Sequence, residues 1–250
     1  MVYTCVYLIL VSHTLLAFAN QLPTDIEKCH YGDTKCLAKS MNYVIKHYGK
    51  TGIPALKWPS LSLVNISTVR FIQDDHSRPI WYEGDMFYTI IKGLENSTVT
   101  KVRGFGEDPS AGDSEINIMI PSTITTSKFK LKVNILNIPI MLSGFSTLDT
   151  QNIRVKAKMS FVRDNRGYVK VYKVIINTKW DRWIIDLKNI DSENTDLINL
   201  MADWINENWA ELFKDAEPFT AQKTNEVVLK LLNDRFSTIR YEDMFLKPNN

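Results

Sequence analysis

The chain has 250 residues, of which 44% are hydrophobic, and a formal net charge of +2. The apolar share is ordinary for a globular protein, and the small charge excludes general affinity for nucleic acid and other polyanions. Glycine and proline are scattered and no linker divides the chain, so we expect a single domain.

An apolar run at residues 6–19 opens the chain and ends in the tripeptide Ala-Phe-Ala, which fits the small-x-small rule of signal peptidase. The run predicts a signal peptide at residues 1–19 and a secreted, extracellular domain at residues 20–250. The alternative is a membrane anchor. Against it, the run is shorter than the roughly 20 residues of a spanning helix and is interrupted by polar residues at 12–14.

Three cysteines occur, and cleavage would remove Cys5 and leave Cys29 and Cys36. A pair in a secreted protein is normally oxidised, so a disulfide is expected. Free thiols or a metal site are the alternatives. A metal would need two further ligands and only His30 is near, while a redox pair usually has the closer C-x-x-C spacing. We expect no metal and no cofactor.

Two N-x-[ST] sequons begin at Asn65 and Asn96. They are weak support for the same compartment, because sequons also arise by chance. If both carry glycan, both lie on the surface.

The first element expected is a helix at residues 34–48, started by Asp33 or Thr34 and stopped by Gly49. Its apolar positions step by three and four. They are Leu37, Met41, Val44, Ile45 and Tyr48.

Residues 61–187 alternate between apolar and polar side chains, which is typical of strands with one buried face. The clearest stretches are residues 128–135 and 153–161, and a turn at residues 164–167 joins the second to another strand. Short turns favour an antiparallel sheet of seven to nine strands with one dry face.

Residues 195–239 carry helical spacing almost throughout, and Pro218 should kink this helix or break it in two. A straight helix of that length would reach roughly 65 Å, longer than a domain of this mass. We therefore expect an α+β fold in which a long, strongly curved antiparallel sheet wraps the C-terminal helix. Such a fold tends to enclose an elongated apolar space.

Several segments in this order resemble the takeout and juvenile hormone binding protein family of arthropods. They are the cysteine pair, GIP at 52–54, WPSL at 58–61, NENW at 206–209 and YEDMFL at 241–246. The chain departs from the family at Ser62-Leu63, where Asp-Pro is frequent, and at Arg240, where proline is frequent. It also lacks the second disulfide of the hormone-carrying branch, so the takeout-like branch is the better match.

This resemblance implies a tunnel for terpenoids, fatty acyl chains or similar lipids between sheet and helix. The predicted function is a secreted carrier without covalent chemistry. It is expected to be a monomer, and an unidentified receptor is considered as a partner. The candidate lining residues are apolar positions of the two clearest strands and of the helix: Phe129, Leu131, Val133, Ile153, Val155, Met159, Phe161, Met201, Trp204 and Ile205.

An enzyme is not expected. Only His30, His47 and His76 follow the predicted cleavage site, and neither a G-x-S-x-G nor an H-E-x-x-H motif occurs. The adjacent carboxylates at 74–75 and 242–243 are interpreted as solvated turns and caps.

The second hypothesis is a secreted structural or signalling protein with a filled core that binds anionic lipid or an acidic partner through a basic sheet face. The plainer interpretation of this face is the wet side of an amphipathic sheet. Its cations are Lys128, Lys130, Lys132, Arg154, Lys156 and Lys158. The four tryptophans at 180, 183, 204 and 209 are interpreted as core residues, with cargo contacts as the alternative.

Overall fold

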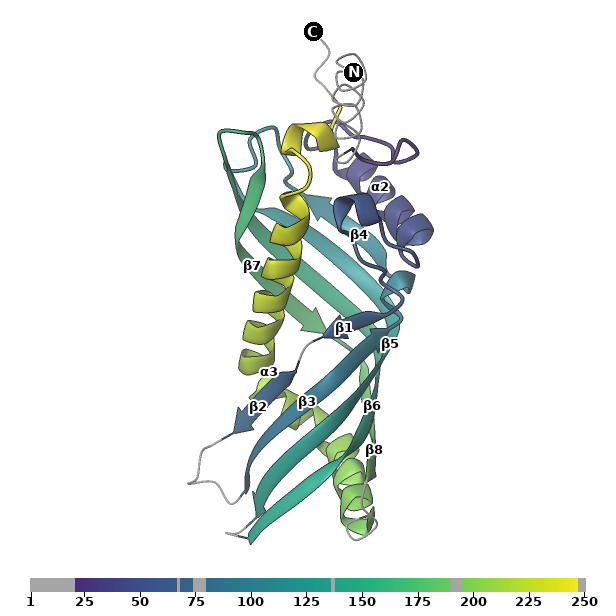
Figure 1. The fold of residues 1–250 in the computed structure, drawn as a ribbon, viewed down its shortest axis with the longest axis vertical. Coiled ribbons are helices and arrows are strands. Elements are labelled where there is room, and N and C mark those ends of the chain that lie inside the picture. The colour runs from purple at the N-terminus through teal and green to yellow at the C-terminus, as the bar shows by residue number, and fades with distance from the viewer. Residues whose placement is uncertain (1–20, 67, 74–79, 136–137, 190–194, 247–250) are drawn as a thin grey trace, which may run out of the picture.

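One antiparallel sheet forms the body of the molecule, and a long helix crosses it (Figure 1). The structure is a computed structural model that describes residues 21–66, 68–73, 80–135, 138–189 and 195–246. The predicted signal peptide lies outside these residues.

The described part of the sheet has eight strands, within the predicted range. They are β1 (Val64–Ile66), β2 (Val69–Gln73), β3 (Ile80–Lys92), β4 (Thr98–Arg103), β5 (Ser114–Ile135), β6 (Ile138–Arg163), β7 (Val169–Lys179) and β8 (Arg182–Asn189). The helices are α2 (Thr34–Tyr48), α3 (Thr195–Phe236) and the short 3₁₀ turns η1 (Pro54–Leu56), η2 (Leu94–Asn96) and η4 (Tyr241–Met244).

The two longest strands, β5 and β6, pair along their whole length and form the spine of the sheet. In one half of the molecule β4 pairs with β5 and β7 pairs with β6. In the other half β3, which carries β1 and β2, pairs with β5, and β8 pairs with β6. We call these the β7 half and the β8 half.

The side-chain alternation of the spine changes phase between the two halves. In β5 the even-numbered Ile120 is buried, Pro121 and Ser122 are exposed, and the odd-numbered Thr123 and Phe129 are buried. Opposite this point Asn152 of β6 has a left-handed φ of 53°, and the pairing passes over Pro121, which has no N–H to donate. Apolar stretches of opposite parity therefore face the same interior.

Helix α2 has the predicted bounds, and the Asp33 side chain accepts a hydrogen bond from the Cys36 amide at 3.0 Å. Helix α3 also lies where the sequence predicts a helix. Of the two outcomes predicted at Pro218, a kink or a break, the break does not occur, because α3 continues from Thr195 to Phe236. Its two halves run in different directions in Figure 1, as a proline-containing helix is expected to do.

Asparagine side chains attach both helices to the edges of the sheet. The Asn206 amide binds both the N–H and the C=O of Ile185 in β8, at 2.7 and 2.8 Å. Further along α3, the Asn233 amide binds both backbone groups of Val171 in β7, at 2.8 and 2.9 Å. In α2, Asn42 does the same to Val99 of β4.

Each amide thus takes the place of a neighbouring strand and satisfies edge groups that would otherwise need water. Asn225 adds a single bond to the Ile176 amide in β7, at 2.9 Å.

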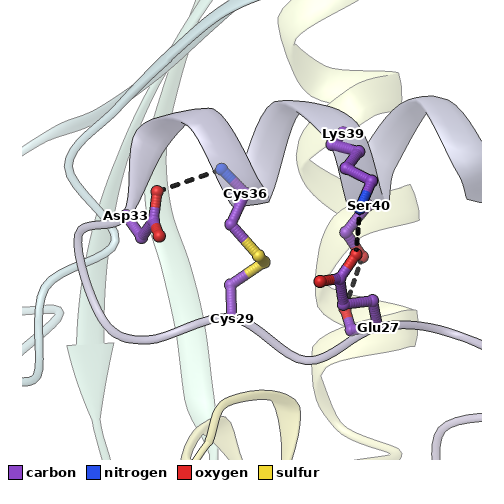
Figure 2. The surroundings of a disulfide bond; sticks show 6 residues. All are labelled: Glu27, Cys29, Asp33, Cys36, Lys39 and Ser40. Carbon is purple, nitrogen blue, oxygen red and sulfur yellow. Dashed lines mark hydrogen bonds and ion pairs between the residues drawn. A yellow bond between two sulfur atoms is a disulfide. The ribbon is translucent and has the colours of Figure 1, made fainter.

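The predicted disulfide is present and joins Cys29 of the N-terminal arm to Cys36 in the first turn of α2 (Figure 2). The arm also binds the far end of the chain, because the Leu246 amide donates to the Cys29 carbonyl at 2.9 Å. Tyr31 stacks on Phe245 with ring centroids 4.5 Å apart. The described N-terminal and C-terminal residues therefore meet at one end of the molecule.

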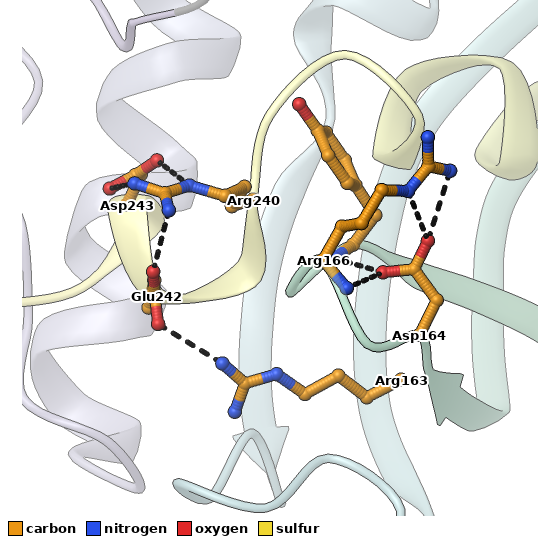
Figure 3. Close-up of polar contacts among 7 residues, drawn as sticks. Arg163, Asp164, Arg166, Arg240, Glu242 and Asp243 are labelled. Carbon is orange, nitrogen blue, oxygen red and sulfur yellow. Dashed lines mark hydrogen bonds and ion pairs between the residues drawn. The ribbon is translucent and has the colours of Figure 1, made fainter.

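Ion pairs connect this end to the β6–β7 hairpin (Figure 3). Arg163 binds Glu242 at 3.0 Å, and Arg240 binds Glu242 and Asp243 at 3.1 and 2.9 Å. These side chains are largely exposed, so each pair contributes little to stability. Arg240, which departs from the family pattern, thus binds both carboxylates of η4.

Candidate ligand-binding interior

Two apolar clusters lie beneath α3, one in each half of the molecule. The β8 cluster contains the buried residues Phe129, Val133, Leu142, Ile185, Leu187, Ile198 and Ala202. The β7 cluster contains Cys29, Leu37, Val99, Val102, Phe105, Met159, Phe161, Val169, Val171, Val174, Ile176, Tyr241 and Phe245.

The structure divides most of the predicted lining residues between these clusters. Phe129, Leu131, Val133, Met201 and Ile205 belong to or pack against the β8 cluster. Val155, Met159 and Phe161 belong to or pack against the β7 cluster.

Two predicted residues lie elsewhere. Ile153 is buried next to the phase change, outside the residues grouped into either cluster. Trp204 does not join the others, because 47% of its surface is exposed.

Several interior side chains are only half-buried. Leu131 of β5 and Val155 of β6 belong to the two spine strands and face the helix side, yet neither is fully buried. Met201 and Ile205 of α3, on the other side of the β8 cluster, are also half-buried. A filled core normally excludes solvent from such positions.

A band of hydroxyl groups separates the two clusters on the inner face of the sheet. It consists of Thr89, Thr123, Ser127, Ser146 and Thr150, each at most 8% exposed. The Ser127 and Ser146 hydroxyls are hydrogen-bonded at 3.0 Å, and Thr123 lies in register with Thr150. Within the described part of the chain, the buried Thr89 Oγ1 has no hydrogen-bond partner.

Sequence reasoning missed this band. Its signal is the polar interruption TITTS at 123–127 and STLDT at 146–150, where Thr123, Ser127, Ser146 and Thr150 occupy positions that the alternation assigns to the inner face.

The basic sheet face is largely neutralised in the β7 half. Lys156 binds Glu115 at 2.9 Å, Lys158 binds Asp113 at 2.8 Å, and Arg154 binds Asp181. These hydrogen bonds lower the pKa of each of the three carboxyls below its ordinary value. In the β8 half, Lys132 lies 3.6 Å from Glu83.

Within the described residues, the histidines and the adjacent carboxylates considered for catalysis lie at the surface. Glu242 and Asp243 bind arginines at the surface, and His47 stacks on Tyr43 with ring centroids 3.9 Å apart. Across the described residues, no group of three or more His, Cys, Asp or Glu side chains is placed to hold a metal ion. His76 and the Asp74-Asp75 pair lie outside them.

Both sequon asparagines are exposed, Asn65 in β1 and Asn96 in η2. Their glycosylation stays a prediction. None of the helices in the described part of the chain is long and apolar enough to cross a membrane.

This fold is similar to that of a protein of known structure. The crystal structure of Epiphyas postvittana Takeout 1 superposes with a TM-score of 0.69 at 16% identity, over 86% of this chain and 97% of that chain. At this identity the likeness shows a shared fold. A crystal structure of lipopolysaccharide binding protein matches at a TM-score of 0.38 and 12% identity, over 81% of this chain and 39% of that one, which is too low for an argument.

No curated protein sequence matches the chain. The family model for haemolymph juvenile hormone binding protein matches residues 5–246, nearly the whole sequence. The chain therefore belongs to the haemolymph juvenile hormone binding protein family.

Proposed function

We propose that the protein is a secreted carrier that holds a hydrophobic ligand between the inner face of the sheet and α3, without covalent chemistry. The observation that carries the proposal is the set of half-buried apolar side chains beneath the helix, Leu131, Val155, Met201 and Ile205. An acyl or terpenoid chain would complete their burial. Membership of a family named for a hormone-binding protein supports the same reading.

The proposed lining keeps the predicted positions that face the interior. It consists of Phe129, Leu131, Val133, Ile153, Val155, Met159, Phe161, Met201 and Ile205. Trp204 is left out because 47% of its surface is exposed.

Burial of such a ligand is sufficient for a useful affinity. A lipid with about 15 buried carbons gains about 12 kcal/mol at about 0.8 kcal/mol per carbon. Loss of ligand freedom costs at least about 4 kcal/mol, which leaves about 8 kcal/mol and a micromolar dissociation constant.

The hydroxyl band favours ligands that carry an oxygen atom. A buried hydroxyl without a partner costs about 1 to 3 kcal/mol, and an oxygen atom of the ligand would remove that cost at Thr89. We therefore expect lipids with an ester, carbonyl or epoxide oxygen in the middle of the molecule to bind more tightly than plain hydrocarbons of the same length.

Native mass spectrometry of the secreted protein tests the carrier proposal. A co-purified lipid supports it, and extraction from the native fluid would identify the ligand. If nothing co-purifies and neither a fatty acid nor a terpenoid probe binds at up to about 100 μM, a concentration well above a micromolar dissociation constant, the proposal fails.

Secretion and processing are part of the proposal. We expect signal cleavage after Ala19, a mature chain that begins at Asn20, and a monomer in solution. N-terminal sequencing and light scattering of protein secreted from insect cells would check these points, and a glycosidase shift would test Asn65 and Asn96.

A further inference from the structure

The outer face of the β8 half carries exposed aromatic and apolar side chains among lysines. Tyr88, Met141 and Phe145 are 77%, 65% and 47% exposed. Lys128 lies in register with Phe145, and Phe145 with Lys188 on the next strand. We call Tyr88, Lys128, Lys130, Met141, Phe145 and Lys188 the outer patch.

The centre of the outer patch is a lysine between two rings. The Lys128 ammonium lies 5.8 Å from the Tyr88 ring centroid and 5.3 Å from that of Phe145. These distances are within the range of cation–π contacts, which keep the Lys128 ammonium beside the two rings. Aromatic side chains and a cation are thus presented together at the surface.

Tyr88 is held outward by the backbone. It sits in the β-bulge of β3, between Phe87 and Ile90, with a left-handed φ of 53°. A bulky residue in this conformation costs roughly 1 to 3 kcal/mol. Since its ring is mostly exposed, packing within the described residues offsets little of that cost.

The charge of this face is positive. Its cations are Arg70, Lys92, Lys128, Lys130, Lys132, Arg182 and Lys188, and its anions are Glu83, Asp85, Asp149 and Asp186. Glu83 is shared by Arg70 and Lys132, and Lys188 lies 3.9 Å from Asp186. Among the described residues, no carboxylate oxygen lies within 4.0 Å of the Lys128 or Lys130 ammonium.

We propose that the outer patch docks the protein on an anionic phospholipid bilayer, with Tyr88, Phe145 and Met141 entering the headgroup region and the lysines binding lipid phosphates. Tyrosine rings favour this depth of a membrane, apolar side chains such as Phe and Met can enter the boundary with the acyl chains, and lysines are attracted to the negative surface. A broad sheet face with scattered apolar groups suits a bilayer better than a concave protein partner. Membrane docking is independent of the proposed carrier function, because vesicle binding can be measured without a ligand in the interior.

Co-sedimentation with vesicles of phosphatidylcholine alone, and of an equal mixture with phosphatidylserine, tests the proposal. We expect binding to the mixed vesicles that weakens with salt. Each lysine near such a surface contributes about 1 kcal/mol, or about fivefold, so the double variant Lys128→Gln, Lys130→Gln should bind about 25-fold more weakly. The variant Tyr88→Ser, Phe145→Ser should bind about tenfold more weakly and should lose the part of vesicle binding that persists at high salt.

The matched control is Lys173→Gln, Lys179→Gln, two exposed lysines of β7 outside the outer patch. This variant has the same net charge as the first and should bind nearly as well as the native protein. Equal losses in both lysine variants would overturn the proposal in favour of overall charge. Absence of binding to anionic vesicles would also overturn it, and binding to polyglutamate without vesicle binding would point instead to an acidic protein.

Discussion

The side-chain amide of Asn206 in α3 hydrogen-bonds both backbone groups of Ile185 in the edge strand β8. Because Asn233 does the same to Val171 of β7, one helix closes the open edge of both halves of the sheet. The helix is thereby fixed over the interior at two distant points, and its apolar side chains are held opposite the sheet.

Asn206→Leu tests this attachment, since leucine has nearly the same volume but cannot pair with the strand. Two lost hydrogen bonds at about 1 kcal/mol each should lower the free energy of unfolding by about 2 kcal/mol, measured by urea denaturation. The control is Asn208→Leu, because among the described residues the Asn208 amide donates to the Trp204 carbonyl within α3 and makes no hydrogen bond to a strand. Equal losses in the two variants would show that the contact with β8 is unimportant.

Replacing Cys29 and Cys36 by serine should lower the free energy of unfolding by about 2.5 kcal/mol, the loop-closure value for a loop of about eight residues. Ligand affinity should change little, because the disulfide lies at one end of the β7 cluster. Native protein in reductant should match the variant. A large loss of affinity with an unchanged fold would mean instead that the N-terminal arm closes the interior.

Asp25 makes the stability of the N-terminal arm depend on pH. The Tyr48 and Tyr43 hydroxyls donate to its carboxylate at 2.6 and 2.9 Å. These bonds lower the pKa of Asp25 from its ordinary value of 3.8, and Asp25 raises the pKa of Tyr48 from 10.0 to about 12.

The two pKa shifts affect stability at opposite ends of the pH scale. Stability from the lowered pKa of Asp25 is complete above about pH 4 and is lost as pH falls through the folded value. Stability from the raised pKa of Tyr48 is complete below about pH 10 and is lost as pH rises towards 12.

Asp25→Asn should remove both dependences. The difference in melting temperature between native protein and variant should be constant near neutral pH and shrink at both extremes. Tyr43→Phe keeps the Tyr48 bond and should therefore keep the alkaline decline. A difference that does not vary with pH would contradict this account.

Thr89→Val tests the hydroxyl band, because valine has the same shape and removes the hydroxyl that lacks a partner. Affinity for an oxygenated lipid should fall about fivefold to tenfold, and affinity for a plain hydrocarbon probe should not fall. Thr147→Val on the outer face is the control, since Thr147 alternates with the buried Ser146. If both lipids bind and Thr89→Val changes their two affinities equally, the hydroxyl band does not distinguish oxygenated lipids from hydrocarbons. The carrier function would still stand.

Much of the fold could be predicted from the sequence, because its elements have strong periods. Helix α2 begins and ends where the spacing of Leu37, Met41 and Ile45 predicts. The strands were harder to delimit. Pro121 and the polar residues after it hide the continuity of β5, which runs on because the register passes over the proline.

The candidate site was only partly predictable. The alternation identifies Phe129 and Met159 as inward-facing, but the sequence cannot distinguish a core position from a position that lines a cavity. The helical stripe also included Trp204, which lies on the exposed side. The hydrogen bonds of Asn206 depend on which strand edge lies beside α3, and the burial of Thr89 depends on the bulge in β3. Both relationships arise only from the three-dimensional fold.

The hydrogen bond from the Leu246 amide to the Cys29 carbonyl imposes an order on folding. The disulfide to Cys36 is local and can form as soon as both residues have entered an oxidising compartment. The arm, however, cannot accept this hydrogen bond until Leu246 has been synthesised, and contacts between residues distant in sequence form slowly. Closure of this end is therefore expected to follow formation of the disulfide, and chains truncated before residue 241 should form the disulfide but leave this end of the molecule open.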